Sequence, residues 1–439
     1  MSTIDTRSTK DHHGADGGAL EQGGAPVTPA EPASASPTRP RRSFWRTLAL
    51  AGPAFVVGAW QFGPGNLASA VQAGSAFGYA LIWVIVVSTI LMIFFTDMSV
   101  RLGMRSPVSL IQSIKDELGK PVGVIAGIGV FCITLMFSVG NAVGSGLGLS
   151  MLLGGSPVLW TVACTITVFA ILLFRNVYRV VERVLISIVA LMAIGFIVSA
   201  IIAQPEWAQA AAGLWPAMPA GSEILVVALV GTNFSINAAF YTSYGIKERG
   251  HTRADYRDIT LVDTIPGIVA PGIMTALVIV VAAAVLGRSG EEATTMNQLA
   301  AIFEPMAGPV GSALFALGLS GAAFSSMIAN ATAGGTMLSD ALGRGPSAAS
   351  RTARIVSAVI LLWGVAITLA FQSSPVGLII TAQALTVLVA PLLGALLLIM
   401  SNRRFMGELR NRWWHNLFAV IGFVAIVATS VRLISSLLG

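Results

Sequence analysis

Apolar runs of about twenty residues, separated by short polar segments, fill most of the chain. A helix needs about 20 mostly apolar residues to cross a hydrocarbon core of about 30 Å. The pattern therefore predicts an all-α membrane protein with eleven transmembrane helices. The predicted spans are residues 47–72, 77–100, 121–150, 157–174, 180–203, 224–246, 262–287, 309–339, 353–371, 376–400 and 413–436.

The composition agrees with a membrane protein. Of the 439 residues, 55% are hydrophobic and 10% are charged, whereas a soluble domain carries roughly a quarter charged residues. This excludes a soluble enzyme or nucleic-acid-binding protein, in spite of the net charge of +6. Cys132 and Cys164 fall in separate predicted spans, which excludes a disulfide-stapled module.

Positive charge is partitioned between alternate connections. Cytoplasmic loops carry an excess of Lys and Arg. If the N-terminus is cytoplasmic, only Arg288 and Arg432 of the 26 basic residues fall outside the inner segments. We therefore predict a multi-pass protein of the cell membrane with its N-terminus in the cytoplasm and its C-terminus outside. The inner segments are residues 1–46, 101–120, 175–183, 247–257, 344–354 and 403–412.

Two spans contain helix-breaking or polar clusters at the same relative depth. The first carries Gly63-Pro64-Gly65 followed by Asn66, and the sixth carries a polar run from Thr232 to Asn237. Broken helices inside a membrane are tolerated where they line a cavity. A five-plus-five inverted repeat brings two such breaks together at the midplane, where they form a substrate site.

The same pattern predicts the domain organisation. Residues 1–43, rich in Gly, Ala, Ser, Thr and Pro, are expected to be a disordered cytoplasmic tail. Residues 44–402 are expected to form the membrane core, with two repeats at about 47–203 and 224–400. Residues 403–439 add a cytoplasmic loop and the eleventh helix.

Ionisable groups are missing from the predicted membrane interior. None of the 20 carboxylates falls deep in a span, although a bare divalent cation prefers carboxylate oxygens and a proton relay uses Asp, Glu or His. The chain has no phosphate-binding Gly-rich loop with Lys-Ser/Thr. ATP is therefore not expected to drive it, and no cofactor is expected.

Several motifs resemble those of the Nramp divalent-metal transporters, over about residues 48–410. The resemblance implies the leucine-transporter type of inverted repeat, with helices 1 and 6 broken and the eleventh span outside the repeat. The motifs are Ala51-Gly52-Pro53-Ala54-Phe55, Gly63-Pro64-Gly65-Asn66-Leu67-Ala68, Phe77-Gly78-Tyr79, Arg101-Leu102-Gly103, Gln383 and Met406-Gly407-Glu408-Leu409.

The chain departs from the family at the positions that carry the metal chemistry. The family's first-helix Asp is replaced by Gly63, and its sixth-helix Met by Ser235. The family's Ala, Pro and first His on the sixth helix correspond to Thr232, Ile236 and Asn237, and its second His to Thr242. The acidic pair that releases protons on the third helix falls at Ser138 and Asn141. The metal carboxylate, the soft sulfur ligand and the proton relay are therefore absent together.

These departures predict a carrier for a hard, partly hydrated divalent cation such as Mg²⁺, which sheds its water reluctantly. Without the relay we expect alternating access without proton coupling, by a monomer. A carrier of a small organic solute, carboxylate or amino-acid-like, and a non-transporting paralogue remain alternatives. The predicted substrate-binding residues are Gly63, Asn66, Thr232, Asn233, Ser235, Asn237 and Gln383, with Asn66 and Asn237 as metal-binding residues through water.

Overall fold

The computed structural model describes residues 60–173, 175–287, 293, 295–303 and 308–438. The predicted tail, residues 47–59 of the first predicted span and Arg288 lie outside these residues. Every regular element among the described residues is helical, which confirms the all-α prediction for this part of the chain. Within the described residues, eight helices, counted across short interruptions, are long and apolar enough to cross a membrane, and the shorter apolar helices include Pro157–Leu173 and Ser187–Ala203.

The helices follow the predicted spans, with short additional helices in the connections. The long and half-length helices are α3 (Pro64–Phe77), α4 (Ile82–Arg105), α6 (Lys120–Leu153), α7 (Pro157–Leu173), α8 (Arg175–Ala203), α10 (Glu223–Asn233), α11 (Ile236–Glu248), α13 (Ile265–Val285), α16 (Pro309–Ala341), α17 (Arg351–Ala370), α18 (Pro375–Thr386), α19 (Ala390–Ser401) and α20 (Trp413–Leu438). The short ones are α5 (Leu110–Leu118), α9 (Trp207–Ala212), η1 (Arg253–Asp255), α12 (Tyr256–Ile259), η2 (Thr260–Thr264), α14 (Met296–Ala300), η3 (Ala301–Phe303) and η4 (Arg404–Leu409).

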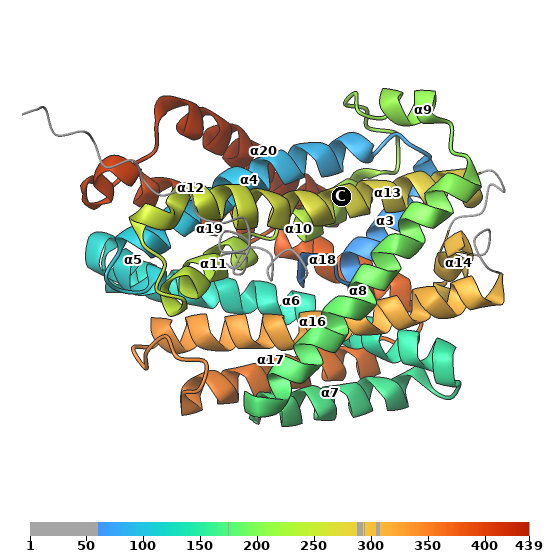
Figure 1. Cartoon of the computed structure of the whole chain (residues 1–439), viewed down its shortest axis with the longest axis horizontal. Helices are drawn as coiled ribbons and strands as arrows, with labels where there is room; N and C mark the ends of the chain where they lie inside the picture. The colour runs from blue at the N-terminus through green and yellow to red at the C-terminus, as the bar shows by residue number, and fades with distance from the viewer. Residues whose placement is uncertain (1–59, 174, 288–292, 294, 304–307, 439) are drawn as a thin grey trace, which may run out of the picture. The chain divides into compact units, whose positions relative to one another are not determined.

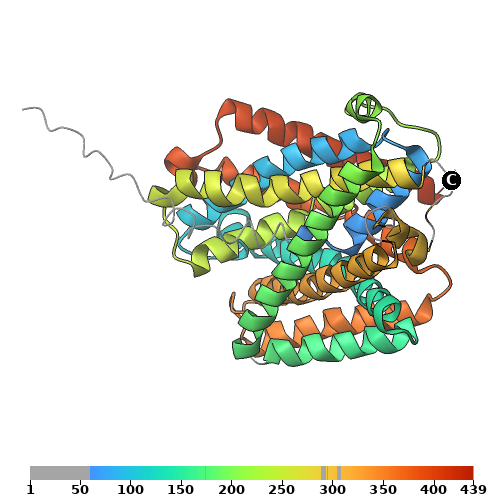
Figure 2. The same cartoon turned by 45° about the vertical axis from the view of Figure 1, so that its right-hand side comes forward.

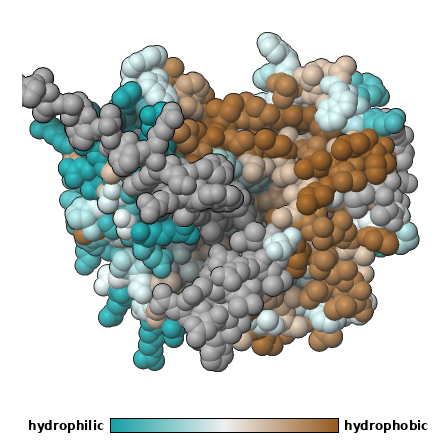
Figure 3. Space-filling model, in the orientation of Figure 1, coloured by the Kyte–Doolittle hydropathy of each residue, from teal (hydrophilic) through white to brown (hydrophobic). Residues whose placement is uncertain are grey.

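Most long helices run roughly along one direction, and α8 crosses them obliquely (Figures 1 and 2). Helix α5, helix α12 and the link between α16 and α17 lie at one end of this arrangement, on the left in Figure 1. Hydrophilic residues gather at the same end in Figure 3, and hydrophobic residues cover much of the remainder of the visible face. Three of the basic segments thus share one end of the helices.

In the part of the chain that the structure describes, three helices are interrupted inside the predicted spans. Trp60 and Gln61 are helical, Phe62 and Gly63 are not, and α3 begins at Pro64. Helix α10 ends at Asn233, and α11 begins at Ile236. Both helices are thus interrupted at the positions of the predicted clusters. A third interruption, over residues 387–389 between α18 and α19, was not predicted. Pro391 at the start of α19 favours it, because proline cannot donate a helical hydrogen bond.

The start of α3 packs closely against α6. A Cβ atom at Gly144 would lie 2.5 Å from Cβ of Pro64, and one at Gly140 would lie 2.7 Å from Nε2 of Gln383. Small residues allow helix backbones to approach in this way. The glycines of α6 therefore hold the first break and Gln383 close to one another.

Helix α4 carries a buried ion pair whose arginine also binds the segment before α20. Arg101 Nε lies 2.8 Å from Asp97 Oδ2, with side-chain exposures of 3% and 8%. Arg101 also donates to the Leu409 carbonyl and to Asn411 Oδ1, both at 2.8 Å, and the Tyr256 hydroxyl donates to Asp97 at 2.8 Å. The charges at this depth are therefore neutralised and hydrogen-bonded, as buried charges must be.

Replacing Arg101 by Met should destabilise the protein by about 3–5 kcal/mol, because it leaves the Asp97 carboxylate buried without its cation. Thermal unfolding in detergent measures this loss. The control is Arg403→Gln, because Arg403 lies 3.9 Å from Glu117 and both side chains are more than a third exposed; exposed pairs contribute about 0–1 kcal/mol. Equal stability of the two variants would contradict the role assigned to Arg101.

Candidate functional site

The first break and helix α10 meet through Asn66. It is the third residue of α3, in the first turn, and is 1% exposed. The Nδ2 group donates to the Gln61 carbonyl at 3.1 Å, and Oδ1 accepts from the Thr232 hydroxyl at 3.1 Å. The Gln61 carbonyl precedes the break, so Asn66 bridges the two halves of the first helix and also reaches the end of α10. The structure therefore brings the predicted residues Asn66 and Thr232 together.

Asn233 turns toward α4 and not toward Asn66. Its Nδ2 group lies 2.7 Å from Ser88 Oγ, 2.8 Å from Thr89 Oγ1 and 3.2 Å from the Ile85 carbonyl. The Asn233 carbonyl accepts a hydrogen bond from the Gln61 amide. Asn233 thus positions the end of α10, and its contribution to the break region is the backbone oxygen.

Gln383 of α18 lies between three helices. A Cβ atom at Gly65 would lie 2.4 Å from Gln383 Cδ, and one at Gly231 would lie 2.4 Å from the Gln383 carbonyl. Gln383 also approaches Gly140 of α6, and its side chain is 1% exposed. Gly65 is therefore required for the close approach of this amide to α3, beyond its effect on the helix break.

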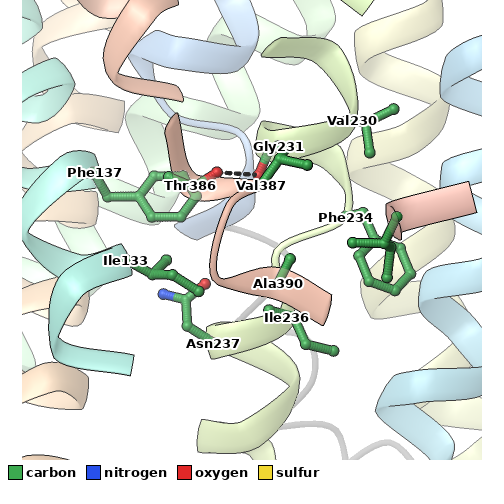
Figure 4. Close-up of a pocket in the computed structure, with 11 residues that line it drawn as sticks. Ile133, Phe137, Val230, Gly231, Phe234, Ile236, Asn237, Thr386, Val387 and Ala390 are labelled. Carbon is green, nitrogen blue, oxygen red and sulfur yellow. Dashed lines mark hydrogen bonds between the residues drawn. The ribbon is translucent and has the colours of Figure 1, made fainter. Parts of the chain in front are cut away.

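The second break presents Ser235 and Asn237. The Ser235 hydroxyl donates to Asn237 Oδ1 at 3.0 Å. Asn237 faces a small cavity that it shares with Thr386, Ile133 and Phe137 (Figure 4). The cavity volume is about 10 Å³, which is about enough for one water molecule. A larger cargo at Asn237 requires the helices around the cavity to separate.

Several buried polar atoms around the breaks have no hydrogen-bond partner among the described residues. They are Gln61 Oε1, Asn141 Nδ2, Asn233 Oδ1, Asn237 Nδ2 and Gln383 Oε1. Leaving such a group unpaired costs about 1–3 kcal/mol, so a set of them points to a ligand or to water. Amide oxygens accept the hydrogen bonds of a metal's water shell, and rotation of an amide exchanges its oxygen and nitrogen.

Gly63 faces α6 and α16. A Cβ atom there would lie 2.9 Å from Ser326 Oγ and 3.6 Å from Asn141 Oδ1. The Ser326 hydroxyl donates to the Trp60 carbonyl at 2.9 Å, just before the break. Among the residues that the structure describes, no group of three or more His, Cys, Asp or Glu side chains could hold a metal.

Four residues join the break region without having been predicted as binding residues. Gln61 lies two residues before the Gly-Pro-Gly motif, and this position beside the break could have indicated it as a site residue. Thr386 follows Gln383 by three residues on one helical face, and its hydroxyl donates to the Gln383 carbonyl at 2.6 Å. Ser326 and Asn141 lie on neighbouring helices, and no local pattern indicates them.

Broken membrane-spanning helices with polar groups at their breaks are typical of multi-pass membrane transporters. Residues 54–436 match the family described as "Natural resistance-associated macrophage protein-like". This match covers most of the chain, which therefore belongs to the Nramp family, as its motifs suggested.

Relatives and solved structures agree with this assignment. The chain is 28% identical over 403 residues to "Divalent metal cation transporter MntH" of Bacillus subtilis (strain 168), covering 90% of this chain and 93% of the relative. It shares its fold with a mutant of the Eremococcus coleocola manganese transporter, at a TM-score of 0.75 and 20% identity over 90% of this chain and 88% of that one. MhsT in complex with L-phenylalanine has a TM-score of 0.56 at 15% identity, over 86% and 98% of the two chains.

Proposed function

We propose that this Nramp-family chain carries a hard, partly hydrated divalent cation such as Mg²⁺ by alternating access. The observation that carries the proposal is the lining of the breaks, where buried amide oxygens lack partners and no carboxylate or sulfur stands among residues 60–66 and 231–237. Soft transition metals prefer thiolate or thioether ligands. Mg²⁺ keeps several waters when bound, and these waters donate hydrogen bonds to neutral oxygens.

The proposed site combines both breaks. Asn66 and Asn237 hold the ion through water, and Gln383 offers its unpaired Oε1 beside α3. Thr232 and Ser235 orient the two asparagines through the hydrogen bonds described above. Gly63 takes the position that the resemblance assigns to the family's carboxylate, and Asn233 supplies its carbonyl oxygen.

We further propose that transport is not coupled to protons. The family's acidic pair corresponds to Ser138 and Asn141 on α6, and the Ser138 hydroxyl donates to the Ile360 carbonyl of α17 at 2.6 Å. From residue 121 to its end, α6 carries no Asp, Glu, His, Lys or Arg. A proton relay inside a membrane normally uses such side chains, so this part of α6 provides no side chain that could bind and release a proton.

The proposed topology has eleven spans in two inverted repeats followed by α20, with the N-terminus in the cytoplasm. The breaks before α3 and between α10 and α11 fall in the first and sixth spans, as a five-plus-five repeat requires. The shared end of three basic segments supports the orientation, since basic loops favour the cytoplasmic side.

Uptake into proteoliposomes tests the function. Vesicles containing the purified protein and an internal pH dye are supplied with Mg²⁺, with Mn²⁺ or with neutral and acidic amino acids, and protein-free vesicles are the control. We expect saturable Mg²⁺ uptake without internal acidification. Mn²⁺ uptake with co-moving protons would refute both the proposed Mg²⁺ selectivity and the proposed absence of proton coupling. Uptake of an amino acid without Mg²⁺ uptake would establish the organic-solute alternative.

Ser235→Met should raise affinity for Cd²⁺ relative to Mg²⁺ by at least about tenfold, or about 1.4 kcal/mol. The reason is that Ser235 stands at the family's thioether position, and soft sulfur favours soft metals. Calorimetry of the purified variant measures both ions. Ser235→Leu has similar bulk without sulfur and should leave the preference unchanged. An equal change in both variants would show that size and not sulfur is responsible.

A further inference from the structure

An apolar groove of about 470 Å³ lies between α4, α10 and α20, within the range of about 300–1,000 Å³ typical of ligand pockets. Its walls include Trp83, Val87 and Leu91 of α4. They also include Val226 of α10 and Ala425 of α20. Val87 is 38% exposed, so the groove adjoins the outer surface of the helices. Asn66 is not part of its wall, but Phe234 lines both the groove and the small cavity at Asn237.

The groove extends along one half of the membrane-spanning helices. Its wall on α20 runs from Gly422 to Arg432, about 15 Å at a rise of 1.5 Å per residue. This is about half of the ~30 Å hydrocarbon core. Beyond Gly422, the rings of Phe94 and Phe418 stack at 4.5 Å with an interplanar angle of 6°, and they join α4 to α20. The length of the groove along α20 therefore matches the thickness of one lipid leaflet.

One ion pair stands at the mouth of this apolar groove. Arg432 lines it, and its guanidinium lies 3.0 Å from Glu223, with side-chain exposures of 53% and 29%. Trp83 lies at the same end, and its indole N–H donates to the Ala217 carbonyl at 2.8 Å. Tryptophan is enriched where the hydrocarbon core meets the head groups. The mouth thus offers one cation and one anion at head-group level.

We propose that an acyl chain of a zwitterionic, amine-bearing phospholipid occupies this groove. The apolar walls suit hydrocarbon, and the depth suits one chain of one leaflet. Arg432 binds the phosphate, because a guanidinium matches phosphate geometry, and Glu223 binds the ammonium group. Phosphatidylethanolamine carries both charges, whereas phosphatidylglycerol lacks the ammonium that Glu223 would bind.

The bound chain contacts the second break from outside. The groove is also lined by Phe234, the residue directly after α10, and by Ser88. Ser88 accepts the amide of Asn233 at 2.7 Å. The proposed acyl chain therefore contacts the residue that follows α10 and the side chain that holds Asn233.

Native mass spectrometry of the purified full-length protein tests the proposal, with phosphatidylethanolamine or phosphatidylglycerol added at equal concentration. We expect at least a tenfold preference for retaining phosphatidylethanolamine. Ala428→Phe fills the groove and should reduce retention at least tenfold. The matched control is Val424→Phe, because Val424 lies one turn away on α20, is 58% exposed and is not part of the groove wall.

The charges are tested separately at the exposed mouth, where substitution spares the packing. Arg432→Gln and Glu223→Gln should each reduce the preference for phosphatidylethanolamine at least threefold. Equal retention of phosphatidylethanolamine by Ala428→Phe and Val424→Phe would overturn the placement of the acyl chain in the groove. A preference that survives both charge substitutions would overturn the recognition of the head group.

Discussion

Gly63→Asp should tighten Mg²⁺ and Mn²⁺ binding at least about tenfold, a change of about 1.4 kcal/mol. The backbone at Gly63 is extended, with φ −92° and ψ −175°, so aspartate adopts it without strain. Its Cβ would lie 2.9 Å from Ser326 Oγ, the end of a side chain that can rotate. A full negative charge beside a dication in a partly dry site contributes several kcal/mol before desolvation costs. Calorimetry with the purified variant measures the affinity.

Gly63→Asn separates charge from shape in this prediction. Gly63 is the N-cap of α3 and makes no side-chain cap, and both Asn and Asp are preferred at an N-cap. Both variants should therefore stabilise α3, but only Gly63→Asp should tighten binding. If both variants bind the ions as the wild type does, position 63 does not face the ion.

Much of the fold could be predicted from the sequence, because its strongest signals are local. Apolar runs of membrane-crossing length indicated the helices, and glycine, proline and clustered amides indicated the first two breaks. The third break, after Thr386, lies in an apolar run whose one signal is Pro391. Periodicity alone does not separate two half-helices from one continuous helix when both are apolar throughout.

The site was predicted less completely, because side-chain direction depends on tertiary packing. The sequence places Thr232 and Asn233 side by side, yet Thr232 reaches Asn66 and Asn233 reaches α4. Ser326 joins the first break from a helix about 260 residues further along the chain. No local pattern encodes such a contact. The Arg101–Asp97 pair is spaced i, i+4 on one helix, but its bonds to Leu409 and Asn411 arise only from the fold.

Asn66→Ala should reduce Mg²⁺ uptake into proteoliposomes by at least about tenfold, equivalent to about 1.4 kcal/mol of lost binding or transition-state stabilisation. The substitution removes an amide that connects the Gln61 carbonyl to the Thr232 hydroxyl. Thr232 keeps the Ala228 and Leu229 carbonyls as acceptors at 3.1 Å, so the fold should lose no more than about 1–3 kcal/mol for the carbonyl left unpaired. Thermal unfolding, measured beside uptake, shows whether the variant is folded.

Asn330→Ala is the matched control for Asn66→Ala. Asn330 is also 1% exposed, and its Nδ2 donates to the Thr134 carbonyl at 2.8 Å, which joins α16 to α6 without contacting Asn66 or Thr232. Both variants remove one buried amide and leave one carbonyl without its donor, so their stabilities should fall together. Uptake should fall only in Asn66→Ala, because only that amide faces the proposed path of the ion. Equal uptake by the two variants would show that Asn66 acts through stability alone and would remove it from the ion site.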